Sequence, residues 1–131
     1  MELITLEKER DGLELTLTAQ SMGRDWNVTI TGGEVPHLGA AALGAPYRHK
    51  DGSIGSSASV LVLPSHKEDG LVKRAAEVLA KRLDRAVLVS GGIHIDGIAP
   101  EQIAAFLDLA RAAVDELGDA MEARAASAGE N

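Results

Sequence analysis

Two short apolar runs flank a helical segment in this chain, and that arrangement constrains the fold more than any other feature. The run ASVLVL at 58–63 and the run AVLV at 86–89 carry consecutive apolar residues, which is typical of strands covered on both faces. Between them, residues 67–83 repeat apolar side chains at helical spacing. Strands joined by a helical crossover run parallel and pair or neighbour in one sheet. We therefore expect the strands 58–63 and 86–90 to be central, parallel neighbours.

The first half of the chain predicts further strands. Leucines alternate with polar residues from 13 to 18, and Asp11-Gly12 suits a hairpin turn, so residues 2–18 predict a hairpin. Alternation returns at 26–31, and the small residues LGAAALG at 38–44 predict a strand whose backbone something can approach closely. Residues 45–57 are rich in glycine and serine and predict a mobile loop.

A second helix is predicted over 100–117, because Pro100 suits a first helical position and apolar residues then recur at helical spacing. Its buried stripe would consist of Ile103, Phe106, Leu107, Ala110, Val114 and Leu117. From Gly118 the pattern weakens, which predicts a frayed or disordered tail at 118–131.

Together these elements predict an α+β fold in a single domain, 1–131, with its core at about 2–117. The sheet should have about six mostly antiparallel strands, one βαβ crossover and two helices on one face. Two such helices hardly cover both faces, and an exposed apolar face usually finds a partner. We therefore expect a homodimer or larger assembly.

Composition excludes several classes of function. The 131 residues carry a net charge of −7 with one Trp, one Tyr and one Phe, which argues against nucleic-acid binding. The absence of cysteine excludes disulfides and thiolate metal sites and fits a reducing, cytoplasmic location. No apolar run is long enough to span a membrane, and the first residues do not have the pattern of a signal peptide.

Three histidines stand in turns next to predicted strands. His66 and His94 each follow the last apolar residues of a strand, and His37 precedes the small-residue strand. All three should lie at the edge of the sheet where the parallel strands end, which is where open α/β sheets usually bind ligands. Each could instead be a solvated or locally hydrogen-bonded loop residue. His49, beside Arg48 and Lys50 in the predicted loop, is interpreted as solvated.

The histidine motifs allow two chemistries. In GGIHIDG, Gly91 and Gly92 allow a ligand to approach closely, and Asp96 could orient His94 or bind a hydroxyl group. Three histidines could also ligate zinc, although their spacing matches no local metal motif.

At these motifs the sequence resembles a family of small bacterial accessory proteins, the LpdD-like prenylated-flavin chaperones. The resemblance rests on TGGEVPHLGAAAL at 31–43, LVLPSHKEDGLVKRAAEVLAKRL at 61–83 and VLVSGGIHIDGIAPEQI at 87–103. It covers about residues 26–117. The family is related in fold to proteasome assembly chaperones, so the resemblance implies a similar fold here.

The resemblance also implies a function. It indicates a non-enzymatic carrier that binds prenylated flavin mononucleotide (prenylated FMN) and delivers it to a UbiD-like decarboxylase of hydroxyarylic acids such as gallate or protocatechuate. A flavin prenyltransferase is a further candidate partner. By matching motif positions, the residues implied in cofactor binding are Gly33, Pro36, His37, His66, Lys67, His94 and Asp96. The alternatives are a three-histidine metal-binding protein or small metalloenzyme, and a pure protein-assembly chaperone.

Overall fold

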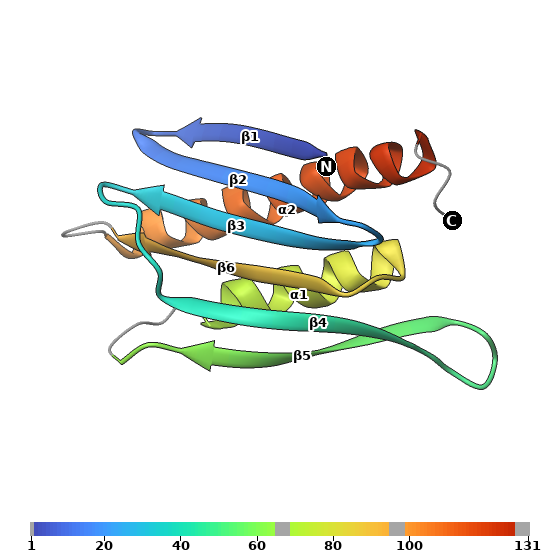
Figure 1. Ribbon diagram of the computed structural model, residues 1–131. Coiled ribbons are helices and arrows are strands. Elements are labelled where there is room, and N and C mark those ends of the chain that lie inside the picture. The colour runs from blue at the N-terminus through green and yellow to red at the C-terminus, as the bar shows by residue number, and fades with distance from the viewer. Residues whose placement is uncertain (1, 65–68, 95–98, 128–131) are drawn as a thin grey trace.

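A single six-stranded sheet with two helices makes up the computed structural model, which describes residues 2–64, 69–94 and 99–127 (Figure 1). The spatial order of the strands is β1-β2-β3-β6-β4-β5, and the fold is the predicted α+β fold with a mostly antiparallel sheet. The elements are β1 (Leu3–Arg10), β2 (Leu13–Met22), β3 (Asp25–Gly33), β4 (Ala40–Arg48), β5 (Ile54–Val62), α1 (Asp69–Leu83), β6 (Val87–His94) and α2 (Pro100–Ser127).

The first three strands form a meander, in which the predicted hairpin is followed by the predicted strand at 26–31. Asp11 and Gly12 both have positive φ, 53° and 80°, which closes the hairpin between β1 and β2. Leu15 and Leu17 of β2 are buried, whereas Thr16 and Thr18 face away from the core. One face of these strands therefore packs on the helices, and the other faces outward.

β6 lies between β3 and β4, and this placement corrects one prediction. β6 pairs in parallel with β3 and antiparallel with β4, and β4 pairs antiparallel with β5. β5 and β6 therefore run in the same direction, as predicted, but they are not neighbours. Nor is β5 central: it is an outer strand, and Leu61 is 79% exposed. Its apolar run does not reflect burial on both faces.

The predicted loop at 45–57 is mostly strand. β4 and β5 continue their ladder as far as the pair Arg48–Ile54, so that only 49–53 form the turn. The backbone N–H of His49 donates to the carbonyl of Ser53 (2.8 Å), and Asp51 accepts hydrogen bonds from both the hydroxyl and the backbone N–H of Ser53. These bonds lower the pKa of Asp51. Serine and glycine are compatible with a strand when a hairpin partner supplies the hydrogen bonds.

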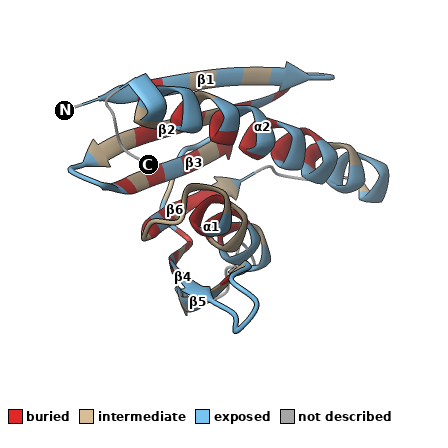
Figure 2. Ribbon diagram, turned by 90° about the vertical axis from the view of Figure 1, so that its right-hand side faces the viewer, coloured by how far each residue is buried: buried red, intermediate tan, exposed pale blue. Residues whose placement is uncertain are grey.

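Both helices cover the same face of the sheet, with α1 against β4, β5 and β6, and α2 against β1 and β2 (Figure 2). Gly44 lets α1 come close, because a Cβ at this position would lie 2.4 Å from the carbonyl oxygen of Ala76. Ion pairs of Lys8 with Glu116 and of Arg124 with Glu2 connect α2 to the β1 side. In the described part of the chain, no helix is both long enough and apolar enough to cross a bilayer.

α2 extends ten residues beyond its predicted end at 117. Leu117, Gly118 and Met121 are all buried, so the expected frayed tail is helix as far as Ser127. The stripe was hard to recognise because alanine and glycine continue it between Leu117 and Met121.

The other face of the sheet, here called the open face, is covered by none of the described residues. On its β2 and β3 half it carries mainly threonines, and on its β4, β5 and β6 half it carries exposed leucines. These are Leu43, Leu61 and Leu88, which are 51%, 79% and 37% exposed.

Candidate functional site

The carboxyl edge of the sheet brings four strands to one place. β3 and β6 end side by side at the pair Gly33–His94, and the N–H of Glu34 donates to the carbonyl of His94 (2.8 Å). β4 begins here, where the N–H of Gly39 donates to Gly91 (2.8 Å), and β5 ends here, where Leu63 donates to Gly39 (2.8 Å). The predicted edge thus exists, built around β3 and β6.

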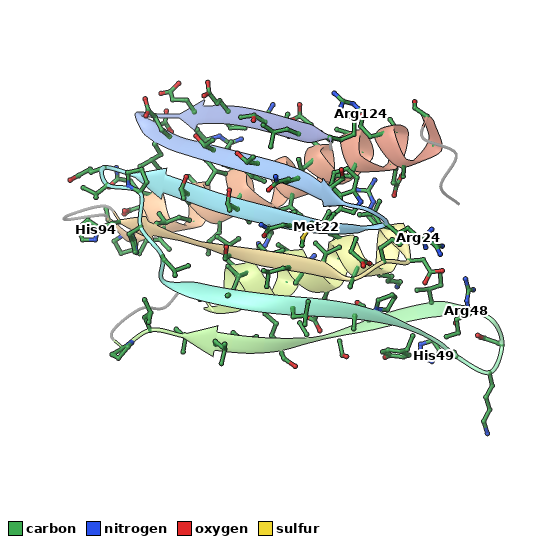
Figure 3. The ribbon with its side chains drawn as sticks, in the orientation of Figure 1. Met22, Arg24, Arg48, His49, His94 and Arg124 are labelled. Atoms are coloured by element: carbon green, nitrogen blue, oxygen red, sulfur yellow. The ribbon has the colours of Figure 1, made fainter. Side chains whose placement is uncertain are left out.

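His37 and His94 meet at this edge. Their ring centroids are 6.1 Å apart and the rings are nearly perpendicular, at 81°. His37 Nδ1 lies 3.3 Å from the carbonyl oxygen of Val35. His94 projects at the end of β6 (Figure 3). Two of the three predicted histidines therefore form one cluster.

The glycine pair in GGIHIDG makes this cluster possible. A Cβ at Gly91, whose φ is 152°, would lie 1.7 Å from the carbonyl oxygen of Ile30, so a side chain would prevent β6 from pairing with β3. A Cβ at Gly92 would lie 2.7 Å from His37 Nε2. Gly91 thus admits the neighbouring strand, and Gly92 admits the imidazole.

The other predicted site residues divide into two groups. Gly33, with a φ of 82°, and Pro36 lie at the same edge as the histidine pair. His66, Lys67 and Asp96 lie outside the described residues. His49 is at the opposite end of the sheet, in the exposed turn after β4, where its ring contacts Tyr47 (centroids 5.1 Å apart; Figure 3).

A groove between α1 and α2 opens beside His94, and sequence reasoning missed it. Its volume is about 660 Å³, within the usual range for small-molecule pockets. Apolar side chains from both helices and from β6 make up most of its lining: Leu71, Ala75, Val78, Ile93, Ile103, Phe106, Leu107 and Val114.

Two residues that were predicted to be buried line this groove instead. Ile103 is 44% exposed and Leu107 is 37% exposed, whereas Phe106 between them is buried. A Cβ at Gly32 of β3 would lie 3.0 Å from Phe106 Cζ, so the ring rests directly on the strand backbone. The available signal was an excess of apolar residues in the first turns of α2, more than the sheet can cover.

Each helix contributes one arginine to the groove, Arg74 from α1 and Arg111 from α2. Arg74 is exposed, but it also lines the groove. With the described residues, Arg111 forms one long ion pair, in which its guanidinium lies 3.8 Å from the exposed carboxylate of Asp108. Across 2–64, 69–94 and 99–127, Arg74 forms no ion pair. Among the lining side chains that the structure describes, Asp115 is the single acidic one.

At the far end of the same helix pair, Arg82 of α1 binds α2 directly. Its guanidinium donates to Glu122 Oε1 (2.9 Å), Asp119 Oδ1 (2.6 Å) and the carbonyl of Asp115 (3.0 Å). These acceptors, Glu122 above all, raise the pKa of Arg82. Gly118 makes the room, because a Cβ there would lie 2.3 Å from Arg82 Nη1.

The arrangement suits a ligand with an extended apolar body and an anionic group. Aliphatic walls exclude water from the body, guanidinium groups bind anions, and imidazoles can hydrogen-bond polar ring atoms. Within the described ranges, no three histidine, cysteine or acidic residues are grouped as they would need to be to hold a metal ion.

The chain matches the family described as "prenylated flavin chaperone LpdD-like domain" over residues 9–122. No curated protein is significantly similar to it in sequence. Among solved structures, it is similar to a chain of a chaperone complex for yeast 20S proteasome assembly, with a TM-score of 0.56 and 15% identity. That similarity covers 89% of this chain and 96% of the other, and at this identity it concerns the fold alone.

Proposed function

Because this chain belongs to the family of LpdD-like prenylated flavin chaperone domains, we propose that it is a non-enzymatic carrier of prenylated FMN. It would bind the cofactor at the carboxyl edge and deliver it to a UbiD-like decarboxylase of gallate- or protocatechuate-type acids in the cytoplasm. A flavin prenyltransferase would supply the cofactor. The observation that carries this proposal is the groove of about 660 Å³ that is lined in part by His94, whose ring contacts that of His37.

The chemistry of the groove supports a flavin. The chain has only three aromatic residues, so the isoalloxazine ring would pack on aliphatic side chains such as Leu71 and Leu107 and on Phe106. The imidazoles of His37 and His94 would hydrogen-bond the polar edge of the ring system. Gly33 and Pro36 would shape the same edge, and we also propose His66, Lys67 and Asp96 for cofactor contact on their motif positions.

Delivery requires a surface that the decarboxylase can contact beside the cofactor. Exposed apolar side chains cluster at the carboxyl edge: Val35 and Leu38 in the connection to β4 are 58% and 56% exposed, and Val62 and Leu63 are 50% and 47% exposed. Exposed apolar groups that lie together mark interaction sites. We propose this cluster as the contact for the receiving enzyme.

The test is co-expression with a flavin prenyltransferase, followed by absorption and mass spectra of the purified protein. A carrier should retain about one prenylated FMN per site and turn nothing over. A three-histidine metalloenzyme would instead purify with stoichiometric zinc, iron or manganese. A protein-assembly chaperone would contain neither.

Alanine variants of the two described histidines sharpen this test. His37→Ala and His94→Ala should each weaken cofactor binding by about five- to a hundred-fold, since a lost hydrogen bond to a partly buried ligand costs about 1–3 kcal/mol. Far-UV circular dichroism should be unchanged, because neither side chain belongs to the core. His49→Ala, at the opposite end of the sheet, is the matched control. Full retention by both variants would contradict the histidine site.

We also propose that two copies associate through the leucine half of the open face. A chain with a net charge of −7 repels a second copy, but Leu43, Leu61 and Leu88 lie in a region of the face where the described strand residues carry no charged side chain. Leu61→Lys should weaken the dimer by at least about a hundred-fold, since each copy loses about 1.5 kcal/mol or more of apolar burial. Light scattering measures this, with the exposed Leu3→Lys on β1 as control. A monomeric parent at micromolar concentration would exclude the dimer.

A further inference from the structure

Two arginines line the groove and take no part in the proposed contacts of the flavin ring system. Arg74 and Arg111 stand on different helices and line one mainly apolar groove, and among the described residues that line it the only other charged one is Asp115. Within the described lining, two guanidinium groups therefore face a single carboxylate, and the other side chains apart from His94 are apolar. This excess of positive charge is local, because the chain as a whole carries −7.

Arginine in such a position attracts a particular class of ligand. Its planar guanidinium forms paired hydrogen bonds with phosphate oxygens, and these charge-assisted bonds are about twice as strong as neutral ones. Arg82 shows that an arginine between these helices is bound tightly when the protein supplies acceptors. Beside Arg74 and Arg111, the groove lining is mainly aliphatic, so it leaves guanidinium donors for a ligand.

We infer that Arg74 and Arg111 bind the phosphate monoester of the flavin, so that the groove selects phosphorylated flavins over riboflavin. This inference rests on the proposed function and extends it to the opposite end of the ligand. The histidine pair contacts the polar edge of the ring system, whereas the arginines contact the phosphate. The negative charge of the protein surface then does not oppose binding, because the phosphate is neutralised inside the groove.

Titration with FMN and with riboflavin, followed by flavin fluorescence, tests the inference. The parent should bind FMN at least tenfold more tightly than riboflavin. Arg74→Gln and Arg111→Gln should each weaken FMN binding by about ten- to a hundred-fold and change riboflavin binding less than twofold. Arg74→Lys keeps the charge but loses the planar guanidinium, so its affinity for FMN should lie between those of the parent and Arg74→Gln. Arg24→Gln, at an exposed arginine in the turn before β3, should behave like the parent.

A second arm uses the prenylated cofactor itself. After co-expression with the prenyltransferase, the double variant Arg74→Gln/Arg111→Gln should retain less than a tenth of the cofactor that the parent retains. Full retention, or equal losses of FMN and riboflavin in the titrations, overturns the phosphate site while the carrier function stands. A parent that retains no prenylated FMN overturns the carrier function as well.

Discussion

At one end of the contact between α1 and α2, Arg82 crosses to the opposite helix and binds three acceptors, whereas at the other end Arg74 and Arg111 face a groove. The difference originates in α2. Near Arg82, α2 presents Asp119, Glu122 and the space left by Gly118, and near the groove it presents apolar side chains such as Ile103 and Leu107. The acceptors on the facing helix thus decide whether an arginine holds helices together or remains available to a ligand.

Giving Arg111 an ionic partner should make the groove end of the helix pair resemble the Arg82 end. Leu107→Glu places a carboxylate four residues before Arg111 on the same helix, in the favourable order for an ion pair. We expect FMN binding to weaken by about thirty- to a hundred-fold, since Arg111 becomes occupied and the new charge repels phosphate, together about 2–3 kcal/mol. Leu107→Gln is the control for size. If both variants bind FMN equally, the charge of Arg111 has no part in binding.

The contribution of Arg82 to the contact between α1 and α2 is tested by replacing this arginine. Arg82→Met keeps an apolar stem but loses the bonds to α2, so the free energy of unfolding should fall by about 1–2 kcal/mol. Urea denaturation measures this loss, and FMN affinity should change less than threefold. The neighbouring, exposed Lys81→Met should leave stability within about 0.5 kcal/mol of the parent. A large loss of FMN binding in Arg82→Met would mean that the two ends are coupled.

The smallest expected effect concerns Gly118. In the parent, Gly118→Ala displaces the Arg82 guanidinium but gains helix propensity, so that stability should fall by less than about 1 kcal/mol. In the Arg82→Met background, only the gain in helix propensity remains. There Gly118→Ala should stabilise the protein by about 0.5–1 kcal/mol. This reversal of sign, read from urea denaturation of the four proteins, is the test. A stabilising effect of equal size in both backgrounds would show that Arg82 does not need the space that Gly118 leaves.

Where a strand has one outward polar face, its sequence was a reliable guide. The alternation in β2 and β3 predicted both strands, and the Asp11-Gly12 turn was placed correctly. The prediction that β5 is central was wrong, because several of its apolar residues lie on an exposed face. The sequence of a single strand also does not show which strand it will pair with. The pairing of β6 with β3 depends on Gly91, which acts only through the distant carbonyl of Ile30.

The candidate site was predictable only in part, for a similar reason. The common edge of His37 and His94 follows from where their strands begin and end. The groove cannot be inferred from the strand ends. It lies between the first halves of two helices, and their separation depends on how the whole molecule packs. Arg74 looks like its neighbour Lys73 in the sequence, and only the position of α2 distinguishes them.

The insertion of β6 between β3 and β4 also affects the order in which the strands can pair during folding. β1, β2 and β3, and likewise β4 and β5, pair through short turns, whereas β6 must join β3 across a separation of 61 residues. Closing such a loop costs more entropy than closing a hairpin, and contacts of this kind slow folding. His37 and His94 meet only after this step. A cofactor that binds both therefore stabilises only those chains in which the last strand has already been inserted.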